Sequence, residues 1–146
     1  MNQPATQAAQ MDLIELRIPC RPEWVALARL AVAAVANRLR FSIEEIEDIK
    51  LAVTEACTAV IQHDNHGESI EIACETDSGA LRLRVHDAGR HVPGAPKSAS
   101  IDFDEARIAG LGVFLIRTLM DEVKYEVHPD TGTDLHMVKK LPVRPV

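Results

Sequence analysis

Apolar and polar residues alternate along several short stretches of the chain, a period of two that predicts strands with one buried face. The alternation is clearest where Leu81, Leu83 and Val85 interleave with polar side chains. In chain order, the predicted strands cover residues 13–18, 69–75, 81–86, 123–127 and 135–138. Residues 77–79, Asp-Ser-Gly, form a turn sequence, so the second and third strands are expected to be joined directly.

Two longer stretches repeat their apolar residues every three to four positions, which predicts helices over residues 22–39 and from Ser42 to about His63. Ser42 and Glu45 form a capping box at the start of the second helix, because each side chain can accept a hydrogen bond from the other's backbone N–H. A third helix is expected over residues 113–120. In the first helix, the residues at helical spacing are Trp24, Leu27, Ala28, Ala31 and Val35, and Trp24 is expected to be a core or dimer-contact aromatic. In the second, the positions expected to face inward are Ile46, Ile49, Val53, Cys57, Val60 and Ile61.

The order strand–helix–helix–strand–strand–loop–helix–strand–strand groups the helices against a mixed or mostly antiparallel sheet, so the predicted class is α+β with two layers. We interpret residues 1–10 as a disordered leader and residues 11–146 as one domain, which is long enough to bury a core. The stretch over residues 90–109 has little periodicity, and loops of this length are usually functional lids or disordered.

Composition narrows the function classes. The net charge is −6 with no basic stripe, which argues against binding to nucleic acid phosphates. No apolar run reaches the roughly 20 residues that a membrane-spanning helix needs, and the N-terminus lacks signal-peptide features. The three cysteines show no C-x-x-C spacing, which argues against a disulfide framework or a zinc site based on cysteine. We therefore expect a cytoplasmic protein in which Cys57 and Cys74 are buried, reduced thiols.

Three segments carry residues that suit chemistry, although each also has a plain structural interpretation. Glu55 is either a solvated carboxylate at the edge of its helix or a general base. Asp87 and Gly89 follow a strand, as in a simple Asp-x-Gly turn or in a site that recognises a ligand amino group. Gly110 and Gly112 open a helix, where backbone N–H groups and the helix dipole favour phosphate, although a glycine-rich helix entry is equally consistent.

The order of these segments, followed by Gly132-Thr133 in a hairpin, resembles a known family. The chain is similar to the GHKL (Bergerat) ATP-binding fold and, within it, to the anti-sigma factor serine-protein kinases that regulate sigma-B and sigma-F type factors. The resemblance extends from about residue 11 to residue 141. Its most specific parts are IEEIEDIKLAVTEACT over residues 43–58 and GLGVFLIRTLMDEV over residues 110–123.

The resemblance implies an ATP site with a role for each matching residue. Asp87 corresponds to the carboxylate that binds the adenine amino group, with Gly89 leaving room for the base. Gly110 and Gly112 correspond to the phosphate-binding glycines. Thr133 corresponds to a threonine that supports the contact between the aspartate and adenine. ATP and Mg²⁺ are the cofactors expected from the family.

The resemblance also implies a catalytic residue and exposes one departure from the family pattern. Glu55 corresponds to the carboxylate that activates the attacking serine hydroxyl or its water. One helical turn later the family has an asparagine whose oxygen holds Mg²⁺, and this chain has Ala59. A methyl group cannot ligate a cation that requires oxygen ligands. Ala59 is consistent with a natural, catalytically degenerate member or with an engineered change.

Two functions follow from the resemblance. The first is an anti-sigma factor, similar to its family in being a homodimer, that phosphorylates a serine of an anti-anti-sigma partner of the STAS type. The alternative is a pseudokinase that docks a sigma factor or a STAS protein without catalysis, and Ala59 is its main support. The catalytic half of a histidine kinase is a third possibility, which the absence of a phosphoacceptor helix domain disfavours.

Overall fold

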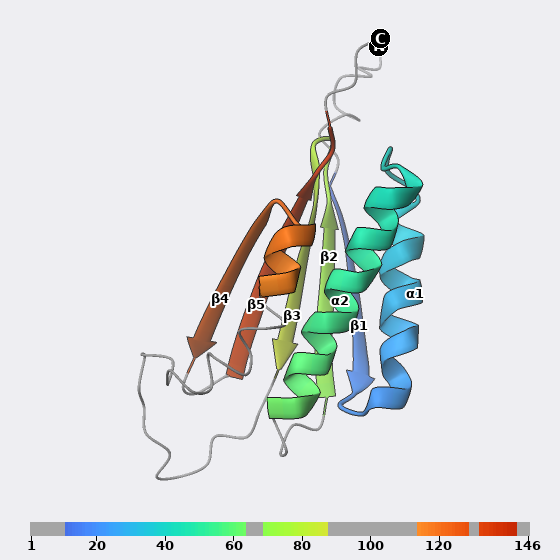
Figure 1. The fold of residues 1–146 in the computed structure, drawn as a ribbon. Coiled ribbons are helices and arrows are strands. Elements are labelled where there is room, and N and C mark those ends of the chain that lie inside the picture. Colours follow the sequence, from blue (N-terminus) through green and yellow to red (C-terminus); the bar gives the residue numbers. More distant parts are fainter. Residues whose placement is uncertain (1–10, 64–68, 88–113, 129–131, 143–146) are drawn as a thin grey trace, which may run out of the picture.

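A five-stranded sheet forms one layer of the protein, and helices lie across one face of it (Figure 1). The structure is a computed structural model that describes residues 11–63, 69–87, 114–128 and 132–142. The strands are β1 (Asp12–Pro19), β2 (Ser69–Thr76), β3 (Ala80–Asp87), β4 (Glu122–His128) and β5 (Gly132–Lys140). The helices are α1 (Val25–Ala36) and α2 (Ile43–His63), with a 3-10 helix at Pro22–Trp24 and a helical segment over residues 114–119.

The strand order is β1-β2-β3-β5-β4, and every neighbouring pair is antiparallel. The α+β class is therefore confirmed, with the sheet antiparallel rather than mixed. The predicted turn joins β2 to β3. The Asp77 carboxylate accepts hydrogen bonds from the backbone N–H groups of Gly79 (2.7 Å) and Ala80 (2.9 Å). The bond from Gly79 is the main reason that the pKa of Asp77 is lowered.

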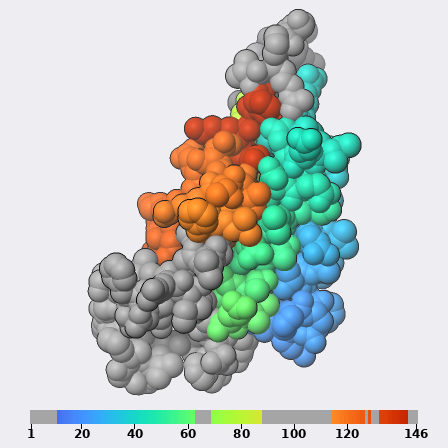
Figure 2. Space-filling view, viewed as in Figure 1, coloured from blue at the N-terminus to red at the C-terminus, as the bar shows by residue number. Residues whose placement is uncertain are grey.

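The core lies between the sheet and the helices. In β2 and β3 every second side chain is buried, as the period of two predicts for a sheet covered on one face. Figure 2 shows that α1, α2 and the segment over residues 114–119 cover the sheet on the viewed face. Among the described residues, the largest fully buried side chains include Ile18, Ile49, Ile70, Ile72, Leu81, Leu83, Ile116 and Met137.

Helix α2 begins where the sequence predicts. Glu45 N–H donates to Ser42 Oγ at 3.1 Å, and Ser42 N–H donates to Glu45 Oε1 at 2.7 Å, so the capping box is confirmed. The inward positions are also confirmed. Ile49, Val53 and Cys57 are fully buried, and Ile46, Val60 and Ile61 pack against the core.

Helix α1 is shorter than predicted, and two apolar residues at its N-terminal end, one of them in the preceding 3-10 turn, point away from the core. Its first turn is the 3-10 helix Pro22–Trp24, and the α-helix then covers only Val25–Ala36. Trp24 is 40% exposed and Leu27 is 45% exposed. The expectation of a core role for Trp24 is therefore wrong. The residues that α1 does bury are Val25, Ala28, Val32, Val35 and Ala36, whose spacing of three and four places Trp24 and Leu27 outside the buried stripe.

The thiol prediction is confirmed. Cys57 and Cys74 are buried, and no disulfide joins the three cysteines. Burial raises the pKa of Cys57 to about 12 and that of Cys74 to about 11, so both thiols are neutral at physiological pH. No helix within the described ranges is long and apolar enough to cross a membrane.

Candidate functional site

One end of the molecule gathers three of the elements that carry predicted site residues. Strand β3 ends there, β5 begins there, and the C-terminal end of α2 lies over them (Figure 1). Strands β3 and β5 are hydrogen-bonded neighbours, and α2 packs on β3. The fold therefore brings residues that are far apart in the sequence together at one end of the central strands.

Asp87 is the last residue of β3, and its side chain points toward the helix layer. It continues the alternation of Leu83 and Val85, which are buried in the core. Asp87 itself is only 7% exposed. A small-molecule pocket is typically lined by apolar side chains, with a few polar groups that orient the ligand. A carboxylate at the edge of an apolar sheet face fits that description.

Thr133 lies directly opposite Asp87. The two residues are Cα partners in the register between β3 and β5. Side chains of directly opposed residues share a face of the sheet, with Cβ atoms about 4.5–5.5 Å apart. Gly132 precedes Thr133 with a φ of 107°, a conformation that residues with side chains rarely adopt, so glycine suits the start of β5. The structure thus brings together the two residues that the resemblance links to adenine.

Glu55 and Ala59 lie one turn apart on α2, and both are partly buried. Ala52, Val53 and Ala56 beside them are buried in the core, which places Glu55 at the edge of the packed face rather than in full solvent. This placement fits both interpretations of Glu55, and its catalytic role stays a prediction. The thiol of Cys57 is neutral because burial raises its pKa to about 12, so it offers no nucleophile in this part of α2.

Gly89, Gly110 and Gly112 lie outside the described residues, as does the predicted lid over residues 90–109. Their roles stay predictions. The helical segment over residues 114–119 starts two residues after Gly112 and lies on the same face of the sheet as α2 (Figure 1). Ile116 anchors this segment in the core, where it is 0% exposed.

Comparison with known proteins identifies the family. The sequence profile of the histidine kinase-like ATPase domain matches residues 18–139. The chain belongs to this family. The match includes Glu55, Asp87 and Thr133. It covers β2, β3 and β4 in full and β5 except Lys140, but only residues 18–19 of β1.

Within this family, the chain is similar to proteins named serine-protein kinase RsbW. It is 37% identical to the one from Bacillus pumilus, over 90% of this chain and 87% of the relative. It is 36% identical to that of Bacillus subtilis, over 89% and 86% of the two chains. For Listeria innocua the identity is 38%, over 92% and 90%. These relatives place the chain among the RsbW-type serine-protein kinases of the histidine kinase-like ATPase family.

A crystal structure of the RsbU and RsbW domains of a Mycobacterium tuberculosis protein supports the fold. It superimposes with a TM-score of 0.66 over 92% of this chain, at 16% sequence identity. The chain spans only 34% of that solved chain, as expected for one domain of a larger protein. The resemblance seen in the sequence is thus confirmed for the family and for the fold.

Proposed function

We propose that this protein is an ATP-dependent serine-protein kinase and anti-sigma factor that phosphorylates an anti-anti-sigma partner of the STAS type. The observation that carries the proposal is the placement of Asp87, a buried carboxylate opposite Thr133 where β3 ends and β5 begins. The names of the relatives support the kinase activity. They favour it over docking without catalysis.

The nucleotide binds at the end of the sheet where β3 ends, β5 begins and the C-terminal end of α2 lies nearby. The adenine amino group donates a hydrogen bond to the carboxylate of Asp87, and Thr133 supports this contact from the neighbouring strand. Gly89 leaves room for the base. Gly110 and Gly112 present backbone N–H groups to the phosphates, in the manner of other anion sites at the start of a helix. The carboxylate of Asp87, next to the apolar face of the sheet, suits a planar base with an exocyclic amino group.

Glu55 acts on the serine of the partner. Its carboxylate accepts the proton of the attacking hydroxyl, or orients that hydroxyl toward the γ-phosphorus, because a general base must lie within hydrogen-bond reach of the proton it takes. A Mg²⁺ ion bound with ATP supplies charge neutralisation at the phosphates. Ala59 has no oxygen, so position 59 would contribute no ligand to such an ion. We expect weaker dependence of nucleotide binding on Mg²⁺ and slower transfer than an asparagine would give.

The partners follow from the same proposal. A sigma factor and a STAS-domain protein compete for the protein, which acts as a homodimer in the cytoplasm. Binding of one partner excludes the other, and phosphorylation of the STAS protein returns the sigma factor to the kinase. The net charge of −6 is consistent with protein partners rather than nucleic acid.

Transfer to a partner tests the proposal directly. The purified chain is incubated with Mg·ATP and each STAS-domain protein of the same genome, and phosphoserine is measured by mass spectrometry. Glu55→Gln is expected to slow transfer by roughly 10²–10⁴-fold while nucleotide affinity changes by less than about threefold. Glu44→Gln is the matched control, because Glu44 is exposed in the first turn of the same helix. If the wild-type chain phosphorylates none of the STAS proteins, the kinase proposal is wrong.

A further inference from the structure

The face of the sheet opposite the helices carries a cluster of histidines and carboxylates that the kinase proposal does not use. We call it the outer-face cluster; its members are His86, Glu126, His128, Asp134 and His136. The register explains why they meet. Asp134 on β5 is the Cα partner of His86 on β3 and of Glu126 on β4, so the three side chains form a row across the sheet. His128 and His136 follow two residues after Glu126 and Asp134, on the same face.

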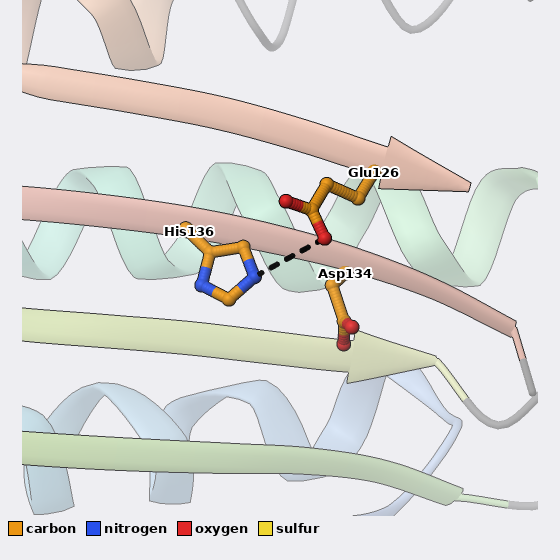
Figure 3. A group of neighbouring side chains, drawn as sticks. All are labelled: Glu126, Asp134 and His136. Atoms are coloured by element: carbon orange, nitrogen blue, oxygen red, sulfur yellow. Dashed lines mark ion pairs between the residues drawn. The ribbon is translucent and has the colours of Figure 1, made fainter. Parts of the chain in front are cut away.

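Two of the histidines approach the same carboxylate oxygen, Glu126 Oε2. His128 Nε2 lies 3.2 Å from Glu126 Oε2 and 3.2 Å from Asp134 Oδ2. His136 Nε2 lies 4.0 Å from the same Glu126 oxygen. One ligand atom each from Glu126, Asp134 and His136 lies within 4.8 Å of the others. In Figure 3 the Glu126 carboxylate and the His136 ring face each other, and the Asp134 carboxylate beside them points toward β3.

These separations are close to those around a bound zinc ion. With Zn–N and Zn–O distances of about 2.0–2.2 Å, the ligand atoms of a tetrahedral site lie roughly 3.3–3.5 Å apart. The two contacts of His128 already have about this length. The contact between His136 and Glu126 needs to shorten by only about half an ångström, which a small side-chain rotation supplies.

The second oxygen of each carboxylate is held by a different group. His86 Nδ1 lies 2.6 Å from Asp134 Oδ1 and donates to it. Lys124 Nζ lies 2.8 Å from Glu126 Oε1. The remaining oxygens, Oδ2 and Oε2, are those that face His128. Metal-ligating carboxylates are commonly oriented in this way by outer-shell hydrogen bonds.

The cluster is also partly withdrawn from solvent. The Asp134 side chain is 10% exposed and that of Glu126 is 29% exposed, while the two histidines are near 40%. Arg84 Nε lies 3.9 Å from Asp134 Oδ1, on the side already engaged by His86, and leaves Oδ2 available. Partial burial strengthens the attraction between a cation and two carboxylates relative to a fully exposed surface.

We propose that the outer-face cluster binds one divalent transition-metal ion of the zinc type, with Glu126, His128, Asp134 and His136 as ligands. Imidazole nitrogens select Zn²⁺ and similar ions over Mg²⁺, which prefers oxygen ligands. This site is therefore chemically distinct from the nucleotide-bound Mg²⁺. Bound metal joins β4 to β5 at the hairpin whose opposite face carries Thr133, so it stabilises the strand that supports the nucleotide edge.

Metal binding to the tag-free full chain tests the proposal. After treatment with EDTA and its removal, ZnCl₂ is titrated calorimetrically, and bound zinc is counted by elemental analysis after dialysis. We expect one Zn²⁺ per chain, unaffected by millimolar Mg²⁺. Zinc at 100 times its Kd should raise the unfolding midpoint by roughly 5–10 °C.

Variants locate the ion. Glu126→Gln and His136→Gln should each weaken zinc binding at least about tenfold and reduce the thermal shift. Glu122→Gln is the matched control, because Glu122 is exposed on the same strand outside the cluster, and it should bind as the wild type does. Both glutamine variants keep neutral hydrogen-bonding side chains, and their midpoints without zinc show that they fold. No stoichiometric zinc binding, or equal affinity in all variants, overturns the proposal.

Discussion

Ala59→Asn places an amide oxygen at the position where the resemblance predicts a magnesium ligand. Ala59 is only partly buried on α2, one turn after Glu55, so a longer side chain there does not have to enter the packed core. Asparagine has lower helix propensity than alanine, which costs up to about 0.7 kcal/mol of folding stability. The unfolding midpoint should therefore fall by roughly 1–3 °C.

Ala59→Asn should bind Mg·ATP more tightly than the wild type does. Outer-shell groups alone change metal affinity by roughly 10–100-fold, so a direct amide ligand should strengthen Mg·ATP binding at least about tenfold, or about 1.4 kcal/mol. Isothermal titration with Mg²⁺ and with EDTA separates the metal-dependent part. The gain should appear only with Mg²⁺, and phosphoryl transfer should rise with it.

Thr58→Asn provides the matched control, because residue 58 is also partly buried but lies about 100° around the helix. It adds the same amide without directing it to the same place, so it should give no magnesium-dependent gain. Equal effects of Mg²⁺ in the wild type and both variants would show that position 59 does not face the phosphates.

Two further predictions concern folding and thiol chemistry. Ser42→Ala removes the hydroxyl that caps α2 and should lower stability by about 1 kcal/mol, seen as a midpoint lower by roughly 2–4 °C; an unchanged midpoint would mean that the capping box contributes nothing. With a pKa of about 12, only about one part in ten thousand of Cys57 is thiolate at pH 8, so a thiol reagent should modify Cys20 well before Cys57 in the native protein. Similar modification rates for Cys20 and Cys57 without denaturant would contradict the buried placement of Cys57.

The elements that depend on local sequence could be predicted. The capping box of Ser42 and Glu45 fixes the start of α2, and the alternation of Leu81, Leu83 and Val85 identifies β3, because both signals act between close neighbours in the chain. The exposure of Trp24 could not be predicted in the same way. Its spacing fits a helix, but the first turn is a 3-10 helix rather than an α-helix. The residues of α1 that face the core lie on a different side of the helix.

Long-range register explains what the sequence left hidden. Asp87 and Thr133 were linked only through the resemblance, and the pairing of β3 with β5 is what makes them direct neighbours. The outer-face cluster had no sequence signal beyond strand alternation. Polar residues on the outer face of a strand normally indicate solvent, and only the pairing of three strands brings His86, Glu126 and Asp134 into one row.

Asp87 is proposed to recognise the amino group of adenine. The affinities of ADP and of IDP, which lacks that amino group, are compared for the wild-type chain, for Asp87→Asn and for a control variant, Asp77→Asn, in the turn that precedes β3. A charge-assisted hydrogen bond is worth about 1.5–3 kcal/mol, so the wild type and the control should prefer ADP by roughly 10–150-fold. Asp87→Asn should lose most of that preference while remaining folded. The same preference for ADP in all three proteins would mean that Asp87 does not bind the amino group of adenine.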